Sequence, residues 1–160
     1  TISYDLNAEQ VADLLRAAPP EWFELTLHQH MPMFHMEHCV FCTFLSNGTS
    51  YKNCGHPCER HHVQLRDRVG QLHPLLADAG CRNTLFNGRA QTGAGFLQDF
   101  RRLGLSRFRL ELLDDPPEKV RLLVSRYREL LDGSCPAARL IRELDVAEQL
   151  GTTEGTLRPG

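Results

Sequence analysis

The 160-residue sequence lacks several features that would each mark a class of protein. No apolar run approaches the roughly 20 residues that span a bilayer, and no secretory signal opens the chain, so we expect a cytoplasmic protein without membrane insertion. The net charge of −2 argues against strong phosphate-driven binding to nucleic acid by the domain alone, although a local patch would suffice to hold an RNA substrate. With 41% hydrophobic and 24% charged residues, the composition is typical of a folded globular protein.

Sequence signatures of several enzyme classes are also missing. The chain has no G-x-S-x-G motif, no discernible Ser-His-Asp order, and no glycine-rich phosphate loop before a helix. The segment from His35 to His38 superficially resembles a zinc-protease helix. Its two histidines are three positions apart, however, whereas the H-E-x-x-H motif needs them four apart. These absences argue against the common serine hydrolases, P-loop enzymes and zinc proteases.

Cysteine and histidine are instead concentrated in one stretch. Residues 31–62 hold four of the six cysteines and five of the eight histidines. The cysteines form two close pairs, which is what a four-coordinate thiolate site needs. In a chain of this length without a secretory signal, such pairs are more often metal ligands than disulfides. Tetrahedral thiolate ligation suits zinc and an iron–sulfur cluster alike. The candidate metal ligands are Cys39, Cys42, Cys54, Cys58 and Cys81.

Five cysteines for four coordination positions mean that one is spare or serves in catalysis. Cys81 is the fifth candidate ligand, and its alternative role is to fill space as a small buried side chain at the start of a strand. Cys135 lies far along the chain beside a helix start, and we expect it to stay apart from the others. A disulfide knot and a set of free thiols remain as alternatives to a metal site.

Hydrophobic periodicity predicts alternating helices and strands. Asn7 is placed to cap a helix over 8–17, and alternating apolar and polar residues predict a strand over 23–33. A hairpin that turns near 67–70 follows the cysteine-rich loop. The remaining predicted elements are strands at 81–88 and 108–113 and helices at 96–104, 118–131 and 136–150.

The order of these elements predicts an α/β fold. Strands alternating with helices are typical of a parallel sheet covered by helices, with the first strand central and buried through Phe23, Leu25 and Leu27. A closed eight-stranded barrel needs about 250 residues, so we expect a partial TIM-barrel-like βα alternation with an inserted cysteine-rich loop and β-hairpin. We expect one domain over 1–150, as a fragment of a longer protein, and a frayed tail over 151–160.

Four residues outside the cysteine set are candidates for catalysis. His28 and His30 share a face of the first strand, and side chains at the carboxyl end of a barrel strand point into an active-site mouth. His35 joins that face only if a bulge or turn near Pro32 resets the register. A protonated imidazole, or the guanidinium of Arg82, would hold the carboxylate or phosphate of a small ligand. Hydrogen-bonded edge histidines and a turn-capping arginine are the alternative.

Three runs of the sequence resemble one known family. ELTLHQHMPMFHMEHCVFC (24–42), CGHPCERHHVQLRDRVG (54–70) and ADAGCRNTLFNGRAQTG (77–93) resemble peptidase family U-32, the collagenase-like proteases. The likeness extends from about Asn7 to Leu131, and the cysteine loop with its hairpin is the specific part. It implies a barrel-like fold of which this chain is the later part, completed by the remainder of a parent polypeptide or by a partner subunit.

The resemblance also implies a cofactor and a chemistry. It implies four cysteines, matched by position to Cys39, Cys54, Cys58 and Cys81, that hold an oxygen-sensitive [4Fe–4S] cluster. Several relatives act in oxygen-independent hydroxylation of RNA bases or of the ubiquinone ring, with prephenate implicated as the oxygen source. The usual cysteine shortly before the loop is replaced here, and Cys42 stands near its other end, so the ligand set is redistributed. The alternatives are a collagenase-like peptidase and a structural domain that binds zinc.

Overall fold

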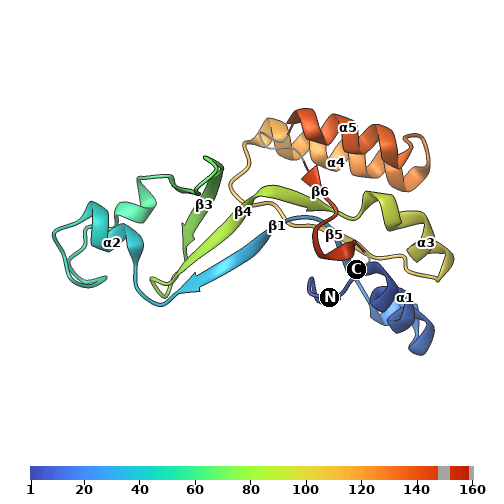
Figure 1. Cartoon of the computed structure of the whole chain (residues 1–160), viewed down its shortest axis with the longest axis horizontal. Coiled ribbons are helices and arrows are strands. Elements are labelled where there is room, and N and C mark those ends of the chain that lie inside the picture. Colours follow the sequence, from blue (N-terminus) through green and yellow to red (C-terminus); the bar gives the residue numbers. More distant parts are fainter. Residues whose placement is uncertain (148–151, 159–160) are drawn as a thin grey trace. The chain divides into compact units, whose positions relative to one another are not determined.

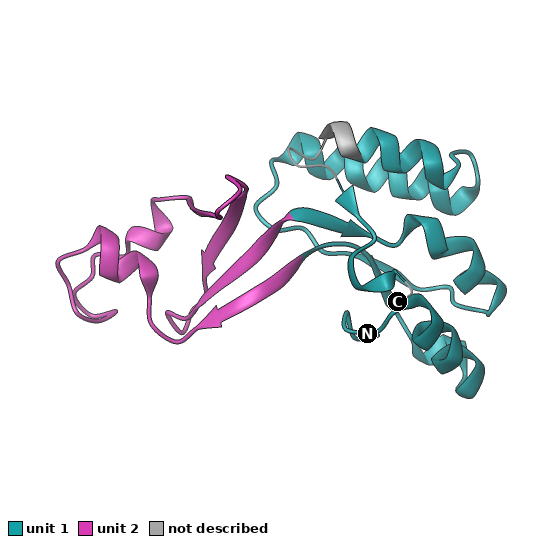
Figure 2. Cartoon of the chain, viewed as in Figure 1, with its two compact units in different colours: residues 1–30, 89–160 teal, residues 31–88 magenta. Residues whose placement is uncertain are grey.

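The structure is a computed structural model that describes residues 1–147 and 152–158. It divides into two compact units (Figure 2). Unit 1 comprises residues 1–30 and 89–160, and unit 2 comprises residues 31–88. The cysteine-rich loop and the hairpin belong to unit 2.

The α/β class is confirmed, but the sheet is open and mixed. Six strands are described, in the order β2-β3-β4-β1-β5, and β6 pairs with β4 (Figure 1). Strand β1 pairs with β5 in parallel, and β4 pairs with β6 in parallel, whereas β2, β3 and β4 are antiparallel neighbours. The expected parallel pairing is therefore present in part, and the β2–β3 hairpin and its pairing with β4 make the sheet mixed. The strands are β1 (Leu25–Met36), β2 (Val63–Arg66), β3 (Leu72–Ala77), β4 (Asn83–Thr92), β5 (Phe108–Leu110) and β6 (Thr152–Thr153).

Helices supply most of the core of unit 1. Helix α1 (Ala8–Ala17) begins at Asn7, which forms a capping box with Gln10, as the sequence predicts. Leu25 and Leu27 at the start of β1 are buried in the same core. Phe23 precedes the strand and is half-buried against that core. The other helices of unit 1 are α3 (Leu97–Arg102), α4 (Pro117–Asp132) and α5 (Ala137–Ala147).

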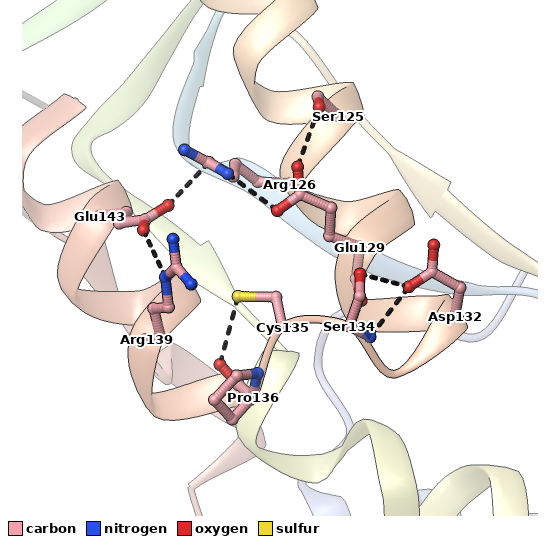
Figure 3. Close-up of polar contacts among 9 residues, drawn as sticks. All are labelled: Ser125, Arg126, Glu129, Asp132, Ser134, Cys135, Pro136, Arg139 and Glu143. Atoms are coloured by element: carbon pink, nitrogen blue, oxygen red, sulfur yellow. Dashed lines mark hydrogen bonds and ion pairs between the residues drawn. The ribbon is translucent and has the colours of Figure 1, made fainter.

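Helices α4 and α5 form a hairpin closed by ion pairs (Figure 3). Gly133 ends α4 in the left-handed region at φ 85°, a conformation that favours glycine. Glu143 on α5 bonds to Arg126 on α4 at 2.7 Å and to Arg139 at 2.8 Å. Hydrogen bonds from Arg139 hold the pKa of the Glu143 carboxyl below its usual value. Cys135 is buried in the turn between the two helices, with its thiol 3.6 Å from the Pro136 carbonyl oxygen.

The end of the chain packs on unit 1, so the expectation of a frayed tail is wrong for its described part. Thr152 and Thr153 pair with Ala90 and Gln91 of β4. Leu157 then enters the core of unit 1 and is 3% exposed. Burial of an apolar side chain and a strand pairing together offset the entropy of ordering these residues.

Unit 2 has a much smaller core. Strands β2 and β3 form the predicted hairpin, in which the Asp67 carboxylate accepts hydrogen bonds from the amides of Val69 and Gln71. The short helix α2 (Val40–Leu45) lies inside the predicted cysteine loop and places Phe41 in contact with this hairpin's apolar face. The buried hydrophobic residues of unit 2 are Phe41, Leu75 and Leu85.

Candidate metal centre

The first cysteine pair is built around the amino terminus of α2. Cys39 caps the helix, and its Sγ accepts a hydrogen bond from the Cys42 amide at 3.4 Å. The side chain of Asn83, which is fully buried, accepts from the Val40 amide at 2.6 Å and lies 3.9 Å from the Cys39 sulfur. Asn83 therefore ties the start of β4 to the first cysteine pair, because its amide satisfies a helix amide that would otherwise lack a partner.

The second pair depends on two tight turns. A Cβ on Gly48 would lie 2.5 Å from the Asn53 carbonyl oxygen and 2.6 Å from the Cys54 Cα, so only glycine permits this approach. After Cys54, Gly55 and His56 both adopt left-handed backbone conformations, at φ 69° and 52°. These turns reverse the chain and lead into a short 3-10 helix that carries Cys58.

Cys81 lies in a separate turn of unit 2. Its backbone is left-handed at φ 62°, which is uncommon for a residue other than glycine. Asp78 holds this turn by accepting hydrogen bonds from the amides of Gly80 at 2.8 Å and Arg82 at 2.9 Å. The turn brings Cys81 within electrostatic reach of Cys42.

The pKa values of two thiols reflect this shared neighbourhood. Burial raises the pKa of the Cys42 thiol, and negative charge at Cys54 and Cys39 raises it further. Burial likewise raises the pKa of the Cys58 thiol, as does charge at Cys39. Thiolates that repel one another in this way are stabilised by a bound cation, which makes the cluster a chemically suitable donor set.

The sulfurs share a neighbourhood without converging on one point. All six cysteines are free thiols, so the disulfide knot is absent. Across residues 1–147 and 152–158, no group of three or more His, Cys, Asp or Glu side chains is arranged to ligate one metal ion. Cys135 belongs to unit 1 and is 2% exposed in its core. The five other cysteines all lie in unit 2 and are half-buried.

His28 is a buried residue of unit 1 whose environment favours the neutral imidazole. Its ring is 0% exposed, and its Nδ1 lies 3.3 Å from the Tyr127 hydroxyl. Burial, followed by the charge of His30, lowers the pKa of His28 from 6.5 to about 4. This core favours the neutral imidazole, which argues against a protonated His28 as the group that holds an anionic ligand.

The other candidate polar residues have different environments. His30 is half-buried in unit 1, with its ring 6.4 Å from that of His28. His35 belongs to unit 2, where its Nδ1 lies 2.9 Å from the Thr84 hydroxyl. The Arg82 guanidinium forms an exposed ion pair with Asp78 at 2.7 Å, which makes it part of the turn around Cys81.

Sequence reasoning missed the partners of His28. Tyr127 on α4 bonds to the Thr92 hydroxyl at 2.7 Å and donates to the Leu27 carbonyl oxygen at 3.3 Å. Tyr127 falls at a core-facing position of the α4 periodicity, so its burial was predictable. Its pairing with His28, 99 positions away, and with Thr92, 35 positions away, was not. The ion pair between Asp115 and Lys119, at 2.7 Å with Asp115 7% exposed, was missed as well.

Comparisons with protein-family models, curated proteins and solved structures found no match to this chain. Among the residues that the structure describes, none of the helices has both the length and the apolar character needed to cross a membrane.

Proposed function

We propose that the chain is the later part of a barrel-like α/β enzyme in which thiolates of unit 2 hold a [4Fe–4S] cluster. The reaction that it supports is oxygen-independent hydroxylation of an RNA base or a small aromatic ring. The observation that carries the proposal is the gathering of five free, half-buried thiols in unit 2, around turns that only unusual backbone conformations permit. The sequence runs that resemble the U-32 family supply the reaction class.

The interactions of the thiols favour one set of four ligands. The Cys42 amide donates to the Cys39 sulfur at 3.4 Å, and the Cys42 thiol donates to the carbonyl oxygen of Gly48, which packs against the Cys54 backbone. Negative charge at Cys39 and Cys54 raises the pKa of the Cys58 thiol, whereas Cys81 lies in a separate turn. We therefore propose Cys39, Cys42, Cys54 and Cys58 as the ligands and Cys81 as the spare thiol. This set differs from the one that the resemblance implies in having Cys42 where that one has Cys81.

The protein groups around the sulfurs have a definite role in this proposal. When bound, an iron–sulfur cluster supplies one-electron redox chemistry. The Cys42 amide donates to the Cys39 sulfur, and such hydrogen bonds stabilise negative charge on a thiolate and tune its metal. Neutral His28 holds Tyr127 in unit 1, while half-buried His30 is the imidazole that we propose to contact substrate.

A structural zinc site is the second candidate. The specific observation in its favour is the small core of unit 2, which has three buried hydrophobic residues among those described. A bound metal contributes folding free energy to units that bury little apolar surface. A zinc ion held by four thiolates would stabilise unit 2 without supplying redox chemistry.

The deciding experiment is anaerobic purification of the full chain, followed by absorption spectroscopy and by iron, sulfide and zinc analysis. We expect a broad absorption band at the blue end of the visible range, with iron and sulfide in equal amounts. Colourless protein with one zinc per chain would overturn the cluster proposal and favour the structural site. A peptidase activity that survives removal of all metal would instead favour the collagenase-like alternative.

Single cysteine variants test the ligand set. Replacing Cys39, Cys42, Cys54 or Cys58 by Ala should lower the metal content strongly. Cys81→Ala should retain most of the metal, and Cys135→Ala is the matched control because that thiol is buried in unit 1. Loss of metal in Cys81→Ala with retention in Cys42→Ala would restore the set that the resemblance implies.

A further inference from the structure

Two cysteines of unit 2, Cys42 and Cys54, are brought near each other at Gly48. The Cys42 thiol donates to the Gly48 carbonyl oxygen at 3.4 Å, and Gly48 packs directly against the Cys54 backbone. The two cysteines are twelve positions apart in the sequence, so this proximity depends on the fold of the intervening loop.

The intervening loop is held by its own hydrogen bonds. The Asn53 side chain accepts from the amides of Thr49 and Ser50, both at 2.9 Å. The Ser46 hydroxyl accepts from the Gly48 amide at 2.8 Å. These bonds involve no sulfur, so they order the loop between Cys42 and Cys54 without a contribution from a metal.

One of the two thiols also borders an open cavity of about 630 Å³. Residues 44–48 and 53–55 line it, and Cys54 is among them whereas Cys42 is not. The lining is mainly polar, so the cavity admits water and small polar solutes. A small oxidant dissolved in water therefore reaches the cavity that Cys54 lines.

We propose that Cys42 and Cys54 are an oxidation site that forms a reversible disulfide when the metal-free chain meets a peroxide. The Cys54 sulfur attacks a peroxide oxygen, which breaks the O–O bond, oxidises the thiol to a sulfenic acid and releases water. The Cys42 sulfur then attacks the Cys54 sulfur, forming the S–S bond, and the departing hydroxyl takes the thiol proton to give a second water. The two thiols are thus oxidised by two electrons, and one hydrogen peroxide is reduced to two waters.

The disulfide removes two sulfur donors from unit 2. Cys39, Cys58 and Cys81 remain, which are too few for a four-coordinate thiolate site. Metal occupancy and oxidation therefore exclude each other, and this consequence alone rests on the proposed function. The disulfide itself is tested without any metal, so the two proposals fail separately.

The test uses the full chain, stripped of metal with a chelator under anaerobic conditions and treated with equimolar hydrogen peroxide. Thiol titration should show a loss of two of the six thiols, restored by dithiothreitol. Remaining thiols are alkylated before tryptic digestion. Cleavage after Arg16, Lys52 and Arg60 places Cys39 with Cys42 on one peptide and Cys54 with Cys58 on the next, so fragmentation of the linked pair must identify the sulfurs.

Two variants give the result independently of fragmentation. In Cys39→Ser/Cys58→Ser, the linked pair of peptides should form as in the wild type, since Cys42 and Cys54 remain. In the matched control Cys42→Ser/Cys58→Ser, which keeps Cys39 and Cys54, it should be absent. A wild-type disulfide between any other two cysteines, or retention of all six thiols under peroxide, would overturn the proposal.

Discussion

Acidification should destabilise unit 1 through a single buried side chain, His28. The folded chain holds this imidazole neutral because burial lowers its pKa from 6.5 to about 4, and its ring is 0% exposed. As the pH falls below 6.5, the unfolded chain binds the proton first. The stability that depends on the neutral form is therefore complete above pH 6.5 and is lost progressively as the pH falls to 4. The difference between the two pKa values corresponds to about 3 kcal/mol.

The assay is equilibrium unfolding in urea, followed by circular dichroism, at a series of pH values from 7 to 4. His28→Asn is the matched variant, since its amide keeps a polar partner for the Tyr127 hydroxyl and does not titrate. The cavity left by the smaller side chain lowers the free energy of unfolding equally at every pH. Other histidines and carboxylates titrate alike in both proteins and cancel in the difference.

The expected result is a difference in pH dependence, not only in stability. The free energy of unfolding of the wild type should fall more steeply than that of His28→Asn, and the difference between the two should narrow by about 3 kcal/mol from pH 7 to pH 4. Parallel curves across this range would refute the reasoning, because they would mean that the imidazole titrates equally in the folded and unfolded chains.

Three further substitutions test other parts of the structure. Tyr127→Phe leaves the buried Thr92 hydroxyl without its 2.7 Å partner and should lower the free energy of unfolding by about 1–3 kcal/mol in urea; no change would mean that water replaces the bond. Leu25→Asp places an unpaired charge at a 4% exposed position and should cost about 3 kcal/mol or more, seen as a lower Tm, whereas an unchanged Tm would contradict the burial of β1. Gly48→Ala introduces a Cβ 2.6 Å from the Cys54 Cα and should reduce metal content after reconstitution; full metal content would show that the loop tolerates the displacement.

Elements set by neighbouring residues were predictable from the sequence. Helix α1 begins at Asn7 because the Asn7 and Gln10 side chains bond to each other's backbone amides three positions apart. Helix α4 ends where Gly133 takes up a left-handed conformation. The hairpin of β2 and β3 follows from its apolar pattern and from the turn at Asp67. In each case the interactions lie within a few residues, so a local pattern carries them.

Other features depend on residues that are distant in the sequence. Periodicity placed His28 and His30 on one face of a strand, but the neutral state of His28 follows from burial beside Tyr127, 99 positions away. Strand β6 and the burial of Leu157 require β4 as a partner, which no pattern within the last ten residues indicates.

The candidate metal centre divides in the same way. The spacing of its cysteines predicted a group of five thiols, which all lie in unit 2, and set Cys135 of unit 1 apart. Tertiary structure decided which cysteines come near one another. Gly48 and Asn53 fold the loop so that Cys54 lies near Cys42, and Asn83 of β4 holds the start of α2 beside Cys39. Spacing determines which donors a loop offers, whereas the contacts among them depend on packing and hydrogen bonds between segments that sequence order alone does not bring together.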